Sequence, residues 1–573
     1  MKTLILNGFG MVLLSIISLI AIGLGESTLD NLETTKYYYT IDESRLLIND
    51  VIEAKMGLYE FKTYSPFKLV LDGIKTSGLE SYVTKASVMQ IDYLELRKLK
   101  ESKSENIILN IPINEKEDIV LELTKVNILG SDFKVVEMSN KGVQQVQYTP
   151  GVYYRGRIKN HEGSIASVSV FDDHIMGVLA DENGNYNLGP LLDNKQITNK
   201  YIIYNDRDLK VPFSFKCEVD DASNKMLKPI KNSIEQPGML ARRAVTTYFV
   251  ADYRTFLDKN SNTQQVANYV TGFFNSVATI YQNEYLPIQI ASIAVYTSPD
   301  PYMYLFDSYE ILLAFGSNTK DNFSGDLAHL LSTRPNGFGG IAWIRQLCGH
   351  YDPVDSSGRF AFSNIDTTYY VFPTYSWTVT VVAHEMGHNF GSMHTHACWW
   401  PIRANVIGAI DSCYTAEGGC FSFTQPNYNG TLMSYCHLNG ATNLRNGFGP
   451  MPGDTVRLRY NQGLCFGPVI NSSEPPTMFA LLQNYPNPFN PVTFIRFDVP
   501  QVSTITLVVY DATGREVARL LDNAYYGPGE QSFVFNTSKF SLASGIYFYK
   551  LIARDLTNDK LVYYNVKKMV LIK

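Results

Sequence analysis

The chain has 573 residues, 45% of them hydrophobic and 18% charged, and its formal net charge is −6. At about 150 residues per domain this length predicts three or four folded units, and the composition is that of globular domains, not of a disordered chain. The acidic balance and the lack of a long Lys/Arg run argue against nucleic acid as a partner.

The first 25 residues have the features of a secretion signal. Lys2 precedes an apolar stretch from Leu4 to Leu24, and small residues around Gly25 provide a cleavage site. A membrane anchor is the alternative, because the segment from Phe9 to Gly25 could nearly span a bilayer, but no Lys/Arg cluster follows it. We predict a signal peptide over 1–25, a mature protein without a permanent membrane span, and export to a compartment that permits disulfides.

Residues 26–243 consist of short alternating runs, such as Ile119, Leu121 and Leu123, which Gly, Asn and Asp interrupt. This pattern predicts a mostly β domain. The segment ends at the dibasic pair Arg242 and Arg243, which resembles the exposed sites that trypsin-like proteases cut. Two ordinary surface arginines are the alternative interpretation.

The pattern changes at residue 244. An apolar strand at 247–250, a helix with apolar positions from 266 to 280 and a second strand at 288–295 predict an α/β domain over 244–468. The Ser- and Pro-containing segment 469–478 is typical of a linker. Residues 479–573 contain short strands at 494–499, 504–510, 531–535 and 545–552, which predict an immunoglobulin-like (Ig-like) β-sandwich.

One segment of the α/β domain has the spacing of a metal site. His384 and His388 are four residues apart, so on a helix both imidazoles lie on one face and can bind one ion. Glu385 can take a proton from water at the open side of the metal. Gly391 permits the left-handed backbone that brings His394 back as a third ligand. Three ligands with an open fourth position predict a catalytic zinc ion.

A chance match to the five-residue pattern HExxH is the alternative. With 40 glycines and 9 histidines among the 573 residues, a glycine and a histidine at the two further positions occur by chance in roughly one case in a thousand. The extended pattern therefore favours the zinc site.

The pattern HExxHxxGxxH, followed by a methionine turn, resembles the metzincin zinc peptidases. Met433, in Gly430-Thr431-Leu432-Met433-Ser434-Tyr435, matches the turn methionine that forms an apolar base below the imidazoles. The segments 251–253, 326–331, 339–343 and 385–391 are similar to the adamalysin (reprolysin) family, in particular to its bacterial secreted members. The resemblance implies a zinc-dependent endopeptidase with a mixed sheet and a zinc-binding helix. It also allows a calcium ion, although no loop here has a clear set of calcium ligands.

Two positions depart from the animal members of this family. Those proteins have Asp directly after the third histidine, where this chain has Thr395 and then His396. Their cysteine near the methionine turn precedes the methionine, whereas Cys436 of this chain follows Met433. His396 is therefore a neighbour of the ligands, a substrate-facing residue or a solvated histidine. The ligands and Glu385 match the family.

Six of the seven cysteines lie between Cys348 and Cys465, and six cysteines can pair in 15 ways. The family resemblance implies the pairs Cys348–Cys465, Cys398–Cys436 and Cys413–Cys420. The seventh, Cys217, is then left over, upstream of the dibasic pair. Because a thiolate is a good zinc ligand, we predict that Cys217 holds the fourth zinc position until the prosegment is removed. An inert buried thiol is the alternative.

The C-terminal segment resembles the type A sorting domain of the type IX secretion system. The resemblance rests on Asn484-Tyr485-Pro486-Asn487-Pro488, on 508–517 and 543–549, and on the ending Lys567-Lys568-Met569-Val570-Leu571-Ile572-Lys573. It implies passage through the periplasm of a Gram-negative bacterium, the type IX machinery as a partner, and release or attachment at the outer surface. An adhesion module is the alternative on fold alone.

Together these features predict a secreted zymogen of a zinc endopeptidase. Its parts are a signal peptide (1–25), a β-rich prosegment (26–243), a catalytic domain (244–468), a linker (469–478) and a sorting domain (479–573), and its substrates are proteins or peptides. The competing hypothesis is a catalytically silent surface protein that keeps a zinc-stabilised domain for binding or adhesion. Loss of the glutamate would favour that hypothesis, and Glu385 is present.

Overall fold

The computed structural model describes residues 60–572, apart from 162, 211–216, 218–242, 285, 336–338, 366–370, 404–405, 421–429, 441, 463–477, 485–486, 502, 527–528, 538–539, 541 and 556–559. The predicted signal peptide, Arg242, Cys465 and all but one residue of the predicted linker lie outside the described residues. Within the described ranges, no helix combines the length and the apolarity that a bilayer crossing requires.

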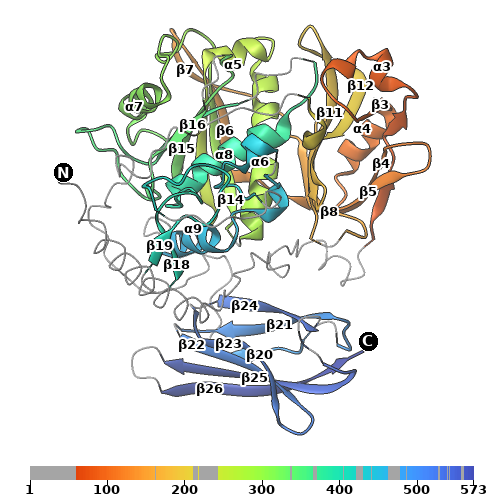
Figure 1. Cartoon of the computed structure of the whole chain (residues 1–573), viewed down its shortest axis with the longest axis vertical. Coiled ribbons are helices and arrows are strands. Elements are labelled where there is room, and N and C mark those ends of the chain that lie inside the picture. Colours follow the sequence, from red (N-terminus) through yellow and green to blue (C-terminus); the bar gives the residue numbers. More distant parts are fainter. Residues whose placement is uncertain are drawn as a thin grey trace, which may run out of the picture. The chain divides into compact units, whose positions relative to one another are not determined.

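The described residues of 62–126 and 152–209 form an N-terminal domain built on a ten-stranded sheet (Figure 1). Apolar residues of the strands and of α4 form its core, as the alternating pattern predicts. The strands, in sheet order, are β1 (Lys62–Tyr64), β4 (Asn106–Pro112), β5 (Asp118–Val126), β8 (Val152–Ile158), β9 (Ile165–Val170), β10 (Ile175–Asp181), β11 (Gly184–Asp193), β12 (Gln196–Asn205), β3 (Ser87–Ile91) and β2 (Phe67–Leu69). The helices are α3 (Gly73–Thr76), η2 (Leu79–Ser81), α4 (Tyr93–Ser102) and η3 (Asp206–Asp208).

The second domain contains a mixed sheet of seven described strands, and the structure thus confirms the mixed sheet. In sheet order they are β16 (Gly340–Ala342), β17 (Phe360–Asn364), β15 (Leu327–Ser332), β13 (Val245–Ala251), β14 (Ile288–Tyr296), β6 (Leu129–Ser139) and β7 (Gly142–Val146). The inner pairs are parallel, and the pairs at both edges are antiparallel. Strands β6 and β7 come from the region that the sequence assigns to the prosegment. Local sequence patterns do not predict that these two strands join the sheet of the second domain.

Four helices contact this second sheet (Figure 1), namely α5 (Tyr253–Asp258), α6 (Thr263–Asn283), α7 (Ser308–Thr319) and α8 (Tyr375–Asn389). The domain also contains α9 (Pro450–Gln462), the short η4 (Cys436–Asn439) and η5 (Leu444–Asn446), and the hairpin of β18 (Trp400–Arg403) and β19 (Val406–Gly408). The predicted strand, helix and strand are β13, α6 and β14, which confirms the α/β interpretation. Helices α6 and α8 contact each other, and α8 also contacts β16 and β17.

The predicted disulfide pairing is wrong for two bonds. The structure joins Cys398 to Cys420 and Cys413 to Cys436. The amide of Cys398 donates to the carbonyl of Glu417 at 2.9 Å, which brings Cys398 beside the segment that contains Cys420. Cys348 is also disulfide-bonded, and its predicted partner lies outside the described residues.

The described C-terminal strands form two sheets that share one apolar core. One sheet contains β20 (Ala480–Leu481), β21 (Val492–Val499) and β24 (Gly529–Asn536), and the other contains β23 (Glu516–Tyr526), β22 (Ser503–Asp511), β25 (Gly545–Asp555) and β26 (Leu561–Leu571). The four predicted strands of this region coincide with β21, β22, β24 and β25. The Ig-like topology stays a prediction.

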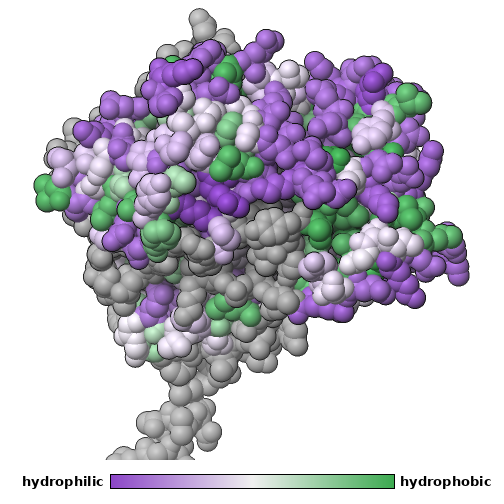
Figure 2. Space-filling view, turned by 90° about the horizontal axis from the view of Figure 1, so that it is seen from above, coloured by the Kyte–Doolittle hydropathy of each residue, from purple (hydrophilic) through white to green (hydrophobic). Residues whose placement is uncertain are grey.

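The face that Figure 2 shows is mainly hydrophilic where it is coloured, with apolar residues in scattered patches. Large apolar side chains that are mostly exposed include Tyr304, Phe306 and Val354. Scattered apolar groups are usual on protein surfaces and mark no single docking site.

Candidate metal centre

Helix α8 carries three predicted site residues, although its sequence is poorly suited to an isolated helix. Residues 377–382 are Trp, Thr, Val, Thr, Val and Val, and β-branched side chains lower helix propensity. Every residue of α8 is buried, so tertiary packing holds the helix in place. The helix thereby fixes His384, Glu385 and His388 in the interior of the domain.

The chain turns back directly after α8. Gly391 has a φ of 96°, a conformation that a side chain would disfavour, and its amide donates to the carbonyl of His388 at 2.8 Å. The predicted positive-φ turn is therefore present. It returns the chain so that Nε2 of His394 lies 3.2 Å from Nε2 of His388.

The three imidazoles all present the same nitrogen atom, Nε2, to one another. Each Nδ1 faces an oxygen atom that can accept its proton, and this leaves each Nε2 with a lone pair directed at the other two rings. Nε2 of His388 lies 3.2 Å from Nε2 of both His384 and His394. Nδ1 of His384 lies 2.6 Å from the Leu432 carbonyl oxygen, and Nδ1 of His388 lies 2.8 Å from the Ser392 carbonyl oxygen. Nδ1 of His394 lies 3.3 Å from Oε2 of Glu417.

This arrangement fits a zinc ion. Burial is the main cause that lowers the pKa of all three histidines well below the usual range, and neutral imidazole is the form that binds metal. Three lone pairs pointing at one another repel unless a cation lies between them. In tetrahedral zinc sites two nitrogen ligands are about 3.3 Å apart, close to the separations found here.

Cys217 completes this cluster. Its Sγ lies 3.6 Å from Nε2 of His388 and 3.6 Å from Oε2 of Glu385. The expected distance between a sulfur and a nitrogen ligand of tetrahedral zinc is about 3.5 Å. The ligand atoms of Cys217, His384, His388 and His394 all lie within 4.8 Å of one another, and all four residues are buried.

Glu385 and Met433 each lie against a glycine. Glu385 is fully buried, and its carboxylate lies so close to Gly340 of strand β16 that a Cβ at this position would overlap Oε1. Met433 is also fully buried, and a Cβ at Gly387 would lie 2.7 Å from its Sδ. Both glycines therefore allow site side chains to approach the backbone.

Sequence reasoning missed two residues beside the histidines. Glu417 contacts His394 through Oε2, and its Oε1 lies 3.1 Å from Nε2 of His396. The solvated alternative for His396 is therefore wrong, since its ring is buried and stacks on His394 at a centroid distance of 4.8 Å. Tyr435 donates its hydroxyl to the carbonyl of Cys217 at 2.5 Å. No sequence pattern marks Glu417, and Tyr435 stands at the end of the predicted methionine-turn segment without a pattern that indicates its contact with Cys217.

Arg243 is held by the second domain. Its guanidinium donates to both carboxylate oxygens of Asp326 at 2.6 and 2.7 Å, and this contact raises the pKa of Arg243. The hydroxyl of Tyr460 donates to the carbonyl of Arg243 at 3.2 Å. Proteolysis after Arg243 thus requires these contacts to open, whereas Arg242 lies outside the described residues.

We expect replacement of Glu417 by alanine to weaken zinc binding about 10- to 100-fold, because His394 loses the carboxylate that fixes its orientation. Glu417→Gln keeps an acceptor oxygen and should lose less. The zinc dissociation constant, measured by competition with a chromogenic chelator, checks this expectation.

Glu310→Ala is the matched control, since Glu310 is an exposed acid on α7 of the same domain. An unchanged zinc affinity in the Glu417→Ala protein would rule out this positioning role.

Two sequence families match this chain. Residues 241–445 match Metallo-peptidase family M12, and residues 483–564 match the Secretion system C-terminal sorting domain. M12 metallopeptidases generally use zinc, in line with the histidine cluster.

Solved structures with similar regions are distant from this chain. Metalloproteinase-II from Bacteroides fragilis is 11% identical over 61% of this chain and 93% of that chain, with a TM-score of 0.31. OgpA from Akkermansia muciniphila is 12% identical over 60% of this chain and 95% of that chain, with a TM-score of 0.21. Latent PorU from Porphyromonas gingivalis is 19% identical over 18% of this chain and 10% of that chain, with a TM-score of 0.14. Residues 241–445 are thus similar to metallopeptidases of family M12, and residues 483–564 are similar to secretion system C-terminal sorting domains.

Proposed function

We propose that the chain is the precursor of a secreted zinc endopeptidase. The observation that carries the proposal is the convergence of three Nε2 atoms beside a buried glutamate. Two of these atoms come from helix α8 and the third from the turn after it, at the spacing that the metzincins share. In this assignment His384, His388 and His394 hold the zinc, and Glu385 is the general base. Met433 forms the apolar base of the site.

Zinc supplies Lewis acidity, which lowers the pKa of water and polarises a carbonyl group. Glu385 takes the proton from the attacking water and later transfers it to the leaving amine. The distance of 3.6 Å between Glu385 Oε2 and the Cys217 sulfur supports this role, because in the proposed precursor that sulfur holds the position that the water takes in the active enzyme. Strand β16 forms one edge of the sheet next to Glu385, and such an edge can pair with an extended peptide substrate.

In the proposed precursor Cys217 blocks the fourth zinc position. The thiolate would take the place of the reacting water, and the hydrogen bond from Tyr435 would hold the backbone of this segment. Cleavage at Arg242 or Arg243 would separate the prosegment from the metallopeptidase domain in sequence. The sorting domain would direct export by the type IX machinery to the outer surface or the medium.

The direct test measures zinc content and cleavage of a denatured protein substrate, before and after limited trypsin treatment of the full-length protein. We expect about one zinc per chain, and activity that follows removal of the N-terminal domain, is lost with a chelator and returns with added zinc. Zinc binding without any activity, once that domain is gone, would instead favour the silent binding protein.

A further inference from the structure

A hairpin from the N-terminal region completes the sheet of the metallopeptidase domain. Strand β6 pairs in parallel with β14, from Leu129 opposite Ile290 to Met138 opposite Tyr296, and β7 pairs with the outer side of β6. Both strands of the hairpin precede Arg243, whereas β14 follows it. One sheet thus joins segments from the two sides of the predicted processing site.

Backbone hydrogen bonds join the two segments at both ends of the paired strands. The amide of Ile290 donates to the carbonyl of Ile128, and the amide of Thr297 donates to the carbonyl of Met138, each at 2.9 Å. Without the hairpin, β14 would become an edge strand with a row of unpaired backbone groups.

Strand β6 is more buried than strand β7, and Val135 is its one buried residue. Val135 of β6 is 2% exposed, and Glu137 accepts a hydrogen bond at 2.5 Å from the hydroxyl of Thr263 at the start of α6. Strand β7 is mostly exposed, and its Val143 is 70% exposed. Strand β6 therefore makes the contact with the second domain, and β7 covers its free edge.

Buried asparagines link the ten-stranded sheet to α6 and α8. The side-chain amide of Asn275 on α6 donates to the backbone carbonyls of Tyr154 and Val168 at 3.0 and 3.2 Å. Asn187 of β11 donates to Ser376 Oγ at 3.0 Å and accepts from the Ser376 amide at 2.7 Å. Separating these surfaces requires water to replace each buried bond.

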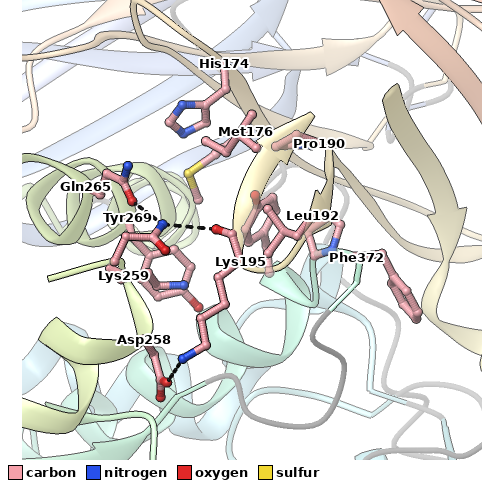
Figure 3. A pocket seen from close by; sticks show the side chains of 14 residues that line it. His174, Met176, Pro190, Leu192, Lys195, Asp258, Lys259, Gln265, Tyr269 and Phe372 are labelled. Atoms are coloured by element: carbon pink, nitrogen blue, oxygen red, sulfur yellow. Dashed lines mark hydrogen bonds and ion pairs between the residues drawn. The ribbon is translucent and has the colours of Figure 1, made fainter. Parts of the chain in front are cut away.

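A cavity of about 80 Å³ lies at one side of this interface, between β10–β12 and helices α5 and α6 (Figure 3). The Lys195 ammonium group forms an ion pair with Asp258 there at 2.8 Å, and the side-chain amide of Asn260 donates to the backbone carbonyl of Lys195 at 3.1 Å. The Lys195 side chain is 41% exposed, so this ion pair contributes little. The hairpin and the buried asparagines make the stronger contacts.

We propose that the N-terminal domain stays bound to the metallopeptidase domain after the chain between them is cut, and that the β6–β7 hairpin is the main element holding it. The partner is a separate piece of this same chain. The proposal rests on the proposed function in treating the N-terminal domain as a prosegment. Release of the hairpin, not the cut itself, then opens the metal site.

The test uses the full-length protein with Glu385→Ala, which prevents self-digestion. The recognition sequence of a site-specific protease is inserted between Gln236 and Pro237, and the folded protein is cut there. We expect both fragments to elute together in size-exclusion chromatography. Elution as two separate species would overturn the proposal.

Two lysine substitutions test the role of the hairpin. Val135→Lys places a charge in the buried contact, and we expect it to raise the dissociation constant of the cut complex about tenfold or more. Val143→Lys is the matched control on the exposed strand and should leave the constant unchanged. Glu137→Ala, a milder change, should weaken the complex severalfold even if the Val135 variant does not fold. Equal affinities for the parent, Glu137→Ala and Val143→Lys proteins would overturn the role of the hairpin.

Activity measurements separate this proposal from the proposed function. The cut protein with Glu385 intact should stay latent until mild urea strips off the N-terminal fragment. Full activity while the fragments still elute together would overturn control by release. A stripped and refolded protein that binds zinc but never cleaves would instead count against the peptidase, and the chromatography would still decide whether the complex exists.

Discussion

Replacing Glu385 with glutamine will remove nearly all peptide-bond hydrolysis while the protein keeps its zinc. Glutamine has nearly the same shape but cannot accept the proton of the attacking water, and loss of a general base costs about 10²- to 10⁴-fold in rate. The three imidazoles keep their hydrogen-bond partners, so zinc binding should change little. Cleavage of a denatured protein by the processed enzyme, together with zinc content per chain, measures both expectations.

The exposed acid Glu310 again supplies the control, and Glu310→Gln should cleave at the parent rate. A Glu385→Gln enzyme that retained the parent rate would exclude this residue as the base. Loss of zinc from that variant would show instead that Glu385 supports the metal site structurally. The contact of its carboxylate with Gly340 makes the precise position of this side chain sensitive to neighbouring substitutions.

The parts of the site that were predictable from sequence are those set by short spacing. His384 and His388 lie one helical turn apart, and the need for a reversal at Gly391 follows from the distance to His394. Strands β13 and β14 and helix α6 were also predictable, because each has a clear apolar periodicity of its own.

The missed features all depend on contacts between distant segments. Glu417 reaches His394 from a loop 23 residues further along the chain, and no local pattern marks such a carboxylate. The two described disulfides link segments between Cys398 and Cys436, and the family resemblance gave the wrong partners for these four cysteines. The hairpin β6–β7 has an ordinary strand pattern, and only its register against β14 reveals that it belongs to the second sheet.

Replacing Cys217 with alanine will give the uncut precursor activity toward short peptides. Removal of the thiol opens the fourth ligand position, while the histidines and Glu385 remain in place. We expect the rate of peptide cleavage to rise at least about tenfold over that of the uncut parent. A tenfold change corresponds to a loss of only about 1.4 kcal/mol in the free energy by which the thiol blocks the site. A short fluorogenic peptide is the appropriate substrate, because the N-terminal domain is still attached and would exclude large proteins.

Thiol chemistry on the unsubstituted precursor provides an independent check of the same latch. A zinc-bound thiolate in a buried site should resist alkylation, and chelation of the zinc should make Cys217 reactive, with the cysteines in disulfides unaffected. Alkylation at the same rate with and without zinc, combined with an inactive Cys217→Ala precursor, would show that Cys217 is an inert buried thiol. Latency would then have to come from the bound N-terminal domain alone, through the hairpin and the buried asparagines that hold it against α6 and α8.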